Sequence, residues 1–276
     1  MLKQRLLNVL FLMSLVLCLC LGQVSAQVAS SLTQQRLERY QRGDFQGAIA
    51  VWNHALNQNP NDQVVLLKYL ARVYSKVGQF EQAIASINPV IASYQKTGDR
   101  VQLERMLTEQ AQAYSSLGQQ RKAISILCGG QESDCIKESA LAIARQQSDP
   151  FGESAGLGSL GNVYRLQGDY DRALRSLSKS LSIAEKLQNS AYSIAAKNGL
   201  GNTYASLAKR DYRYAEFALE TNDQASKGKF TQQAKESDRS AIQSFEAVVT
   251  AARQQNNLTQ ESQALLNLAT SYLRNG

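Results

Sequence analysis

A short phrase recurs along this 276-residue chain and limits what it can fold into. Each copy begins with a glycine and places an alanine, then an aliphatic residue, five and six positions later. The four copies are Gly43–Ile49, Gly78–Ile84, Gly118–Ile124 and Gly168–Leu174. A glycine lets the chain leave one helix in a left-handed conformation, and the residues after it can start the next helix. The phrase therefore predicts tandem helical hairpins.

The residues before three of these glycines follow one face of a helix. A tyrosine stands four residues before the glycine, and a small residue stands three residues before the tyrosine. The tyrosines are Tyr74, Tyr114 and Tyr164, and the small residues are Ala71, Ala111 and Gly161. The alanines of the second helices are Ala83, Ala123 and Ala173. Small residues at both positions predict that the two helices of each hairpin pack closely where they cross.

Composition agrees with a helical chain and leaves few groups for catalysis. The sequence is 43% apolar and 19% charged, as in chains that fold, and its 3 prolines and 7% aromatic residues disfavour an immunoglobulin-type sandwich. One histidine and 4 cysteines are too few for most metal sites or His-dependent nucleophiles. No phosphate loop or His-Glu-x-x-His motif is present. We expect an all-α protein with no catalytic residue, no metal and no cofactor.

The repeated residues resemble the tetratricopeptide repeat. Its Leu-Gly, Tyr, Gly-Asp-Tyr and Ala positions are best matched by Leu160, Gly161, Tyr164, Gly168, Asp169, Tyr170 and Ala173. The first repeat adds Trp52, Ala55 and the closing Asn59–Asn61. The resemblance implies an α-α superhelical solenoid over residues 27–276. It also implies a concave surface, lined by the first helix of each hairpin, that holds segments of other proteins.

The repeats are not evenly spaced. We place them near residues 29–62, 64–97, 104–147, 154–187, 194–254 and 262–276. The third is interrupted by a loop at 128–135, after which a helix is expected to restart near Ile136 and run to Gln147. The second contains Pro89 within its second helix, where the missing amide predicts a kink.

The last two repeats depart furthest from the pattern. The fifth carries an insert at about 209–236, rich in Lys, Arg, Tyr, Glu and Gln, which predicts one extended hairpin projecting from the solenoid. Residues 262–276 are either a capping helix or the first helix of a repeat that continues in a longer protein. Both interpretations stay open.

The N-terminal segment has the features of an export signal. Lys3 and Arg5 precede an apolar run, and Val24–Ala26 supplies the small residues that a signal peptidase reads. We expect cleavage after Ala26, so that residues 1–26 are a signal peptide and the mature protein is periplasmic or extracellular. The alternative is an uncleaved anchor, in which case the protein stays attached to a membrane.

Export changes how the cysteines are interpreted. Cys18 and Cys20 leave with the signal, and Cys128 and Cys135 remain in an oxidising compartment, where thiols pair. We predict a disulfide between these two residues. Zinc is the rival interpretation, but two cysteines and the distant His54 supply at most three ligands. His54 itself is expected to be a surface residue.

Two groups of residues on the predicted first helices are candidates for binding a partner. Lys68, Arg72 and Lys76 follow one another at steps of four, and Asn162, Asn198 and Asn202 lie on the inward face of repeats four and five. Ammonium and guanidinium groups can bind carboxylates, and asparagines can bind a peptide backbone. The alternative for the basic row is a solvated helix face. Some family members clamp a C-terminal carboxylate with a Lys and Asn pair, but Arg72 replaces that Asn here.

A more specific resemblance concerns exported bacterial proteins that place such repeats before a caspase-like CHAT domain. The shared features are the signal, the start Gln35–Phe45 and the extension at 209–236. The predicted function is a non-catalytic scaffold for a protein or peptide partner, acidic if the basic row takes part, without nucleic acid or a small-molecule substrate. The alternative is the substrate-recruiting part of a CHAT peptidase whose catalytic domain is absent from this chain.

Overall fold

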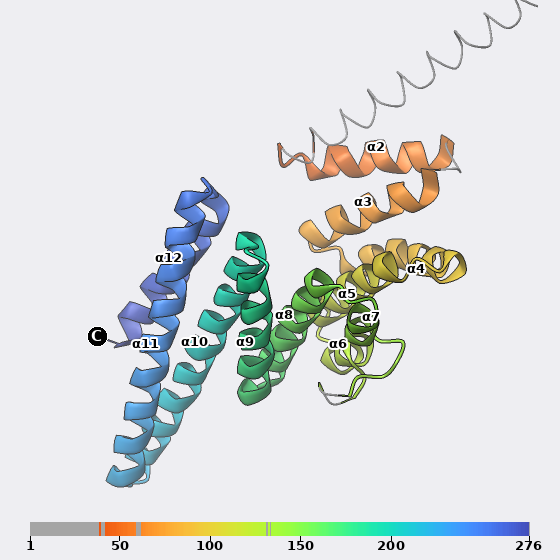
Figure 1. The fold of residues 1–276 in the computed structure, drawn as a ribbon. Helices are drawn as coiled ribbons and strands as arrows, with labels where there is room; N and C mark the ends of the chain where they lie inside the picture. Colours follow the sequence, from red (N-terminus) through yellow and green to blue (C-terminus); the bar gives the residue numbers. More distant parts are fainter. Residues whose placement is uncertain (1–38, 40–41, 59–61, 131, 133, 276) are drawn as a thin grey trace, which may run out of the picture. The chain divides into compact units, whose positions relative to one another are not determined.

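The computed structural model describes residues 39, 42–58, 62–130, 132 and 134–275 of the chain (Figure 1). The described part is built from helices. The predicted signal peptide at 1–26 lies outside the described residues, as does most of the first helix expected for the repeat at 29–62. The contacts divide the chain into residues 1–86, here called unit 1, and residues 87–276, here called unit 2. Each unit is described by itself.

Unit 1 contains α2 (Phe45–Gln58), α3 (Gln63–Lys76) and the first part of α4 (Phe80–Thr97). Trp52 of α2 is buried and stacks on Tyr69 of α3, with 5.4 Å between ring centroids. Asn53 Nδ2 donates a hydrogen bond to Tyr74 Oη at 3.2 Å. These contacts join α2 to α3. His54 is exposed, as expected, and its ring is hydrogen-bonded to Gln58.

Unit 2 contains the rest of α4 and eight further helices. They are α5 (Arg100–Ser116), α6 (Gln120–Leu127), α7 (Ala140–Gln146), α8 (Pro150–Gln167), α9 (Tyr170–Lys186), α10 (Ser190–Glu220), α11 (Gln224–Gln254) and α12 (Leu258–Asn275). Within this unit α5/α6, α8/α9 and α10/α11 are the helical hairpins. The predicted all-α fold of hairpins is confirmed.

The turns within the hairpins have the predicted geometry. Gly78, Gly118 and Gly168 have φ of 78°, 76° and 83°, the left-handed region that glycine adopts without strain. Asp169 then caps α9, because its carboxylate accepts a hydrogen bond from the amide of Arg172. The turn between α4 and α5 also has a glycine at positive φ, Gly98. The later turns between hairpins, and the turn at the tip of α10/α11, have other residues at positive φ. These residues are Ser148, Gln188, Asn222 and Asn256.

The small residues of the repeated phrase lie where helices cross. Ala123 and Ala173 have no exposed surface. A Cβ added to Gly161 of α8 would lie 3.0 Å from the carbonyl oxygen of Ala173 and 2.6 Å from Leu177 Cγ on α9. No larger residue would fit there without moving the helices apart. Close packing at these crossings therefore follows from residue size.

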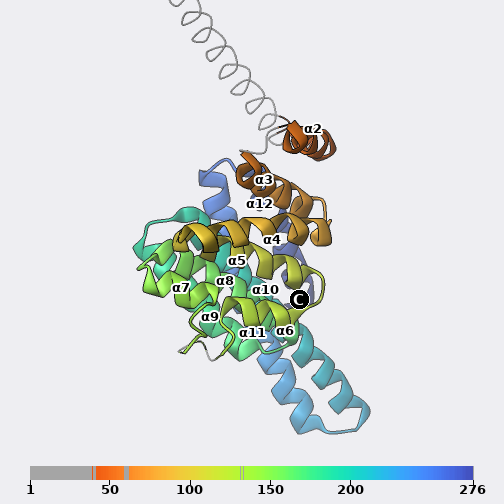
Figure 2. The ribbon, with the colours of Figure 1, turned by 90° about the vertical axis from the view of Figure 1, so that its right-hand side faces the viewer.

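The extended hairpin is present, and its turn lies at Thr221–Asp223. Gly228 lies inside α11 and not at the tip. Helices α10 and α11 have 31 residues each and run on together beyond the other helices of unit 2 (Figure 2). Alanines fill the contact along the extension: Ala208, Ala215, Ala218, Ala234 and Ala241 are all buried.

Two further sequence expectations concern single helices. Helix α4 is continuous from Phe80 to Thr97 with Pro89 inside it, and the kink predicted there stays a prediction. Helix α7 begins at Ala140, later than the expected restart near Ile136. The amide of Ser139 donates to the carbonyl of Ile136 at 2.8 Å, so residues 136–139 form a turn instead of a first helical turn.

In the part of the chain that the structure describes, no helix is both long and apolar enough to span a bilayer.

Candidate functional site

Successive first helices of unit 2 touch through side-chain amides. The helices concerned are α5, α8, α10 and α12. Gln112 Nε2 of α5 donates to Ser159 Oγ of α8 at 2.8 Å, and Asn267 Nδ2 of α12 donates to Asn202 Oδ1 of α10 at 3.3 Å. In both contacts the residue of the earlier helix, Gln112 or Asn202, directly follows the small residue of that helix, Ala111 or Gly201. The residue that it contacts on the following first helix, Ser159 or Asn267, directly precedes a leucine, Leu160 or Leu268.

The contact between α8 and α10 follows the same rule. Asn162 comes directly after Gly161, and its Oδ1 lies 3.4 Å from the position that a Cβ on Gly199 would occupy. Gly199 directly precedes Leu200. Asn162 therefore lies against α10 in the position that Gln112 takes against α8. The residue after the small position is thus a side-chain amide at each of these three junctions.

Asn198 lies one helical turn before Asn202 on α10. Its Oδ1 is buried and has no hydrogen-bond partner within the described protein. We call these five amides the amide row: Gln112, Asn162, Asn198, Asn202 and Asn267. Gln112 is exposed and the other four are partly exposed, so the row reaches solvent along the first helices of unit 2.

The chemistry of the amide row suits a polypeptide main chain. A carboxamide carries donor and acceptor groups side by side, which matches the N–H and C=O of a peptide group. Axes of packed helices lie about 8–10 Å apart, and an extended peptide advances about 3.3 Å per residue. A peptide crossing the helices would therefore meet a new member of the row about every third residue.

The basic row lies in unit 1, whereas the amide row lies in unit 2. Lys68, Arg72 and Lys76 are all on α3; Arg72 and Lys76 are exposed and Lys68 is partly buried. Arg72 follows Ala71, so it holds in α3 the register position that Gln112, Asn162 and Asn202 hold in unit 2. Within unit 2 the structure thus brings together the three predicted asparagines, while the basic row lies on a single helix of unit 1.

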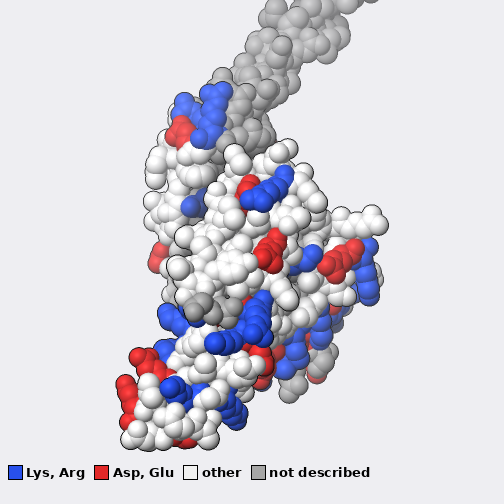
Figure 3. Space-filling model, turned by 90° about the vertical axis from the view of Figure 1, so that its left-hand side faces the viewer, with Lys and Arg blue, Asp and Glu red and all other residues white. Residues whose placement is uncertain are grey.

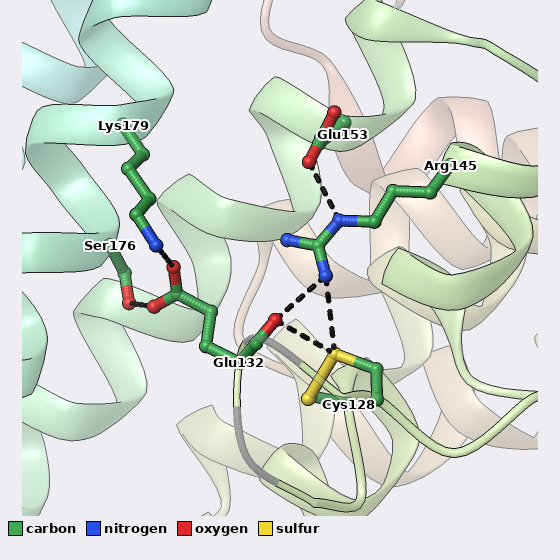
Figure 4. Close-up of polar contacts among 7 residues, drawn as sticks. Cys128, Glu132, Arg145, Glu153, Ser176 and Lys179 are labelled. Carbon is green, nitrogen blue, oxygen red and sulfur yellow. Dashed lines mark hydrogen bonds and ion pairs between the residues drawn. A yellow bond between two sulfur atoms is a disulfide. The ribbon is translucent and has the colours of Figure 1, made fainter.

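The predicted disulfide joins Cys128 and Cys135. It closes the loop between α6 and α7, and Cys128 has no exposed surface. Arg145 of α7 holds the loop from one side: its Nη1 donates to the carbonyl of Glu132 at 2.7 Å, and its Nε donates to Glu153 of α8 at 2.7 Å (Figure 4). The loop is therefore tied to the two helices that follow it.

Glu132 ties the same loop to α9. Its carboxylate accepts hydrogen bonds from Ser176 Oγ at 2.5 Å and from Lys179 Nζ at 2.7 Å (Figure 4). Burial acts to raise the pKa of Glu132, but the bonds from Lys179 and Ser176 outweigh it, and the pKa lies below its usual value. Glu132 is charged at neutral pH, so this contact is an ion pair that braces the interrupted hairpin.

A separate cleft lies at the tip of the α10/α11 hairpin. It measures about 350 Å³ and has a mainly apolar lining. Tyr214 and Phe230 line it with their rings in contact, 5.3 Å between centroids, and Phe217, which also lines it, is 64% exposed. The sequence indicated an extended hairpin here, but it did not indicate an apolar cleft, because the three aromatic residues come from two helices.

Charges do not form one large patch on the face of the molecule drawn in Figure 3, where Lys and Arg are interspersed with Asp and Glu. Among the described residues no group of three or more His, Cys, Asp or Glu side chains could hold a metal ion. The amide row itself contains no charged side chain.

Sequence reasoning missed two members of the amide row. Gln112 could have been found, because it follows Ala111 as Asn162 follows Gly161. Asn267 gave no such signal, since it contacts Asn202 from 65 residues away, across the long α10/α11 hairpin.

Comparison with known proteins supports the repeat interpretation. Residues 39–110 and residues 157–191 each match a family model of the tetratricopeptide repeat. No curated protein matches the sequence.

Several solved structures resemble the fold. A Rap protein complexed with Competence and Sporulation Factor has a TM-score of 0.54 and 16% identity, over 87% of this chain and 73% of that one. The apo form of RapI has a TM-score of 0.50 and 15% identity, with the same coverage. BtubC from P. vanneervenii has a TM-score of 0.45 and 13% identity, over 88% of this chain and 91% of that one. At these identities the similarity is one of fold.

Proposed function

We propose that this chain, in which tetratricopeptide repeats are present, is an exported, non-catalytic scaffold that binds an extended segment of a partner protein along the amide row. The observation that carries the proposal is the repeated placement of Gln112, Asn162 and Asn202 at three successive junctions of first helices. Such spacing gives a peptide main chain regularly placed donors and acceptors. Side chains of the peptide would then add specificity.

Two observations support the parts of this proposal. The Rap protein with a similar fold was solved in complex with Competence and Sporulation Factor, so the fold is compatible with holding a partner. The disulfide between Cys128 and Cys135 supports export, since disulfides persist mainly in oxidising compartments. The first observation supports partner binding, and the second supports export.

The alternative, that the chain recruits substrates for a CHAT peptidase, is based on the sequence resemblance. In that case the same amide row would receive the substrate segment. Co-purification of a caspase-like peptidase activity that depends on this chain would favour the alternative. Peptide binding without any such activity favours the scaffold.

The test uses peptides selected from a random library against the purified protein. Removing two amides in the double variant Asn162→Ala/Asn202→Ala should weaken the selected peptides about tenfold or more, because each lost hydrogen bond is worth about 1 kcal/mol. N-methylation of the peptide main chain should weaken binding to the wild type and have less effect on the variant.

The matched control is Gln95→Ala, which removes an exposed amide from α4, outside the amide row. It should leave affinity unchanged. Equal affinity of wild type and double variant would refute the amide row as the binding site. Loss of binding in Phe217→Ser alone would place the site in the apolar cleft at the hairpin tip.

A further inference from the structure

A glutamate occupies a position in α5 where the other hairpins of unit 2 bury small or apolar residues. Glu104 is 1% exposed. The residues in the same register are Ser154 of α8 and Ile194 of α10, both also 1% exposed. Ser154 satisfies its hydroxyl by donating to the carbonyl of Ser180. Glu104 has no such arrangement, because its Oε1 is buried without a hydrogen-bond partner.

The carboxyl group of Glu104 is packed into the contact between α5 and α8. A Cβ added to Gly152, in the first turn of α8, would collide with the Glu104 carboxyl group. Thr108, one turn further along α5, also has a buried hydroxyl without a partner. Two turns along, the hydrogen bond between Gln112 and Ser159 completes the same contact. We call this α5–α8 contact the Glu104 seam.

The charged groups around Glu104 do not compensate its charge. The nearest cation is Arg105, whose Nε lies 3.6 Å from Glu104 Oε1 and whose Nη2 lies 3.2 Å from Asp149 Oδ2. Asp149 caps α8 and adds a second carboxylate beside the first. On the same turn of α8, Glu153 is paired with Arg145 of α7. One half-exposed arginine is thus shared between two carboxylates.

We propose that the Glu104 seam responds to protonation: neutral Glu104 lets α8 pack closely on α5, and ionised Glu104 loosens that contact. A buried carboxylate without a full set of hydrogen bonds is costly, whereas the neutral acid is tolerated in an apolar contact. Burial, and after it the charge of Asp149, raises the pKa of Glu104 from 4.5 to about 7, against the opposing effect of Arg105.

The direction of the pH effect follows. Because the folded-state pKa lies above the unfolded-state value, Glu104 favours the folded seam at low pH. That contribution is lost as pH rises from about 4.5 to about 7 and stays lost above it. The first turn of α8 should therefore open more readily at pH 8 than at pH 5.

The experiment is amide hydrogen exchange of the α8 first turn, residues 151–154, in the wild type and in Glu104→Gln, corrected for intrinsic base catalysis. In the wild type, protection should fall by a factor on the order of 100 between pH 5 and pH 8, since the shift in pKa spans more than two tenfold steps. In Glu104→Gln it should stay constant. The control Glu220→Gln, an exposed carboxylate on α10, should behave as the wild type.

A second measurement needs no variant. Carbon-13 NMR of the Glu104 carboxyl in the wild type should show titration near pH 7. Titration near 4.5, or parallel exchange profiles for wild type and Glu104→Gln, would overturn the proposal. Both measurements are made on the protein without a peptide. A negative result would therefore overturn the proposal for Glu104 and leave the amide row as a peptide-binding site untouched. Weaker peptide binding above pH 7 is a further consequence that rests on the proposed function, because the row crosses this seam at Gln112.

Discussion

Gly201 of α10 lies directly against the ring of Phe245 on α11. A Cβ at position 201 would lie 2.6 Å from Phe245 Cε1, and the ring has no exposed surface. This is the crossing where the repeat pattern requires a small residue. Gly228, inside α11, is the opposite case, because an added Cβ would meet nothing within 4 Å. The same residue type is thus required by packing at one position and not at the other.

We predict that the substitutions Gly201→Ala and Gly228→Ala shift stability in opposite directions. Gly201→Ala overpacks the crossing and should lower the free energy of unfolding by about 1–3 kcal/mol. Gly228→Ala should raise it by about 0.5–1 kcal/mol, because alanine loses less backbone entropy in a helix. Urea denaturation measures both values. An unchanged or raised stability for Gly201→Ala would contradict the packing described for this crossing.

The disulfide should stabilise the interrupted hairpin. Replacing both cysteines, in Cys128→Ala/Cys135→Ala, should lower the free energy of unfolding by about 2–3 kcal/mol, the value for a short ring that restrains the unfolded chain. A dithiol reductant added to the wild type should produce the same loss, and it should have no effect on the double variant. Wild-type stability that is insensitive to reductant would show that the bond contributes little.

Helix α12 is held by an ion pair to a fully buried carboxylate. Arg274 Nη2 lies 2.9 Å from Asp238 Oδ1, and Asp238 has no exposed surface. Arg274→Met should destabilise the protein by about 2–3 kcal/mol, because it leaves the charge of Asp238 buried and unpaired. The loss lies below that of a fully buried pair because Arg274 is partly exposed, and water already screens the pair in the wild type. Thermal unfolding of the variant checks this value.

The control for α12 is the double variant Asp238→Asn/Arg274→Met, which removes both charges and should recover much of the loss. The effect of Arg274→Met should also shrink at low pH. Burial, opposed by Arg274, already raises the pKa of Asp238, so the carboxyl group becomes neutral on acidification and the cost of burying it falls. A loss in Arg274→Met that does not depend on pH would contradict this account.

The basic row of unit 1 is tested by charge reversal. Changing Lys68, Arg72 and Lys76 to Glu should weaken an acidic peptide selected against the wild type, and the difference should grow as salt is lowered. Isothermal titration at two salt concentrations measures it. Lys96→Glu, an exposed change on α4, is the matched control. Unchanged affinity in the triple variant would identify the basic row as a solvated helix face.

Local features of the fold could be read from the sequence because they depend on neighbours along the chain. Gly168 at φ 83° and the cap at Asp169 are properties of one turn, and Ala173 is small because its own hairpin crosses there. The pairing of Cys128 with Cys135 also needs only a short loop to close. Each of these lies within a single hairpin, where spacing in the sequence is close to spacing in the structure.

The turns that lack a glycine were harder to predict. Ser148, Gln188, Asn222 and Asn256 adopt the left-handed conformation without being glycine. Each lies just after the end of a helix, α7, α9, α10 or α11, and no glycine in the sequence marks that end. Conversely Gly228, the one glycine of the insert, lies within α11, and the tip forms at Thr221–Asp223.

The sequence by itself determined the helical hairpins, their turn glycines and the small residues at each crossing, because these are set by backbone conformation and side-chain size. Only the tertiary structure decided which polar groups meet between hairpins: Gln112 with Ser159, Asn202 with Asn267, and Glu104 with the first turn of α8. These contacts depend on how each first helix is rotated and displaced against the next. Rotation and displacement are fixed by the intervening second helices, whose lengths vary from one hairpin to another.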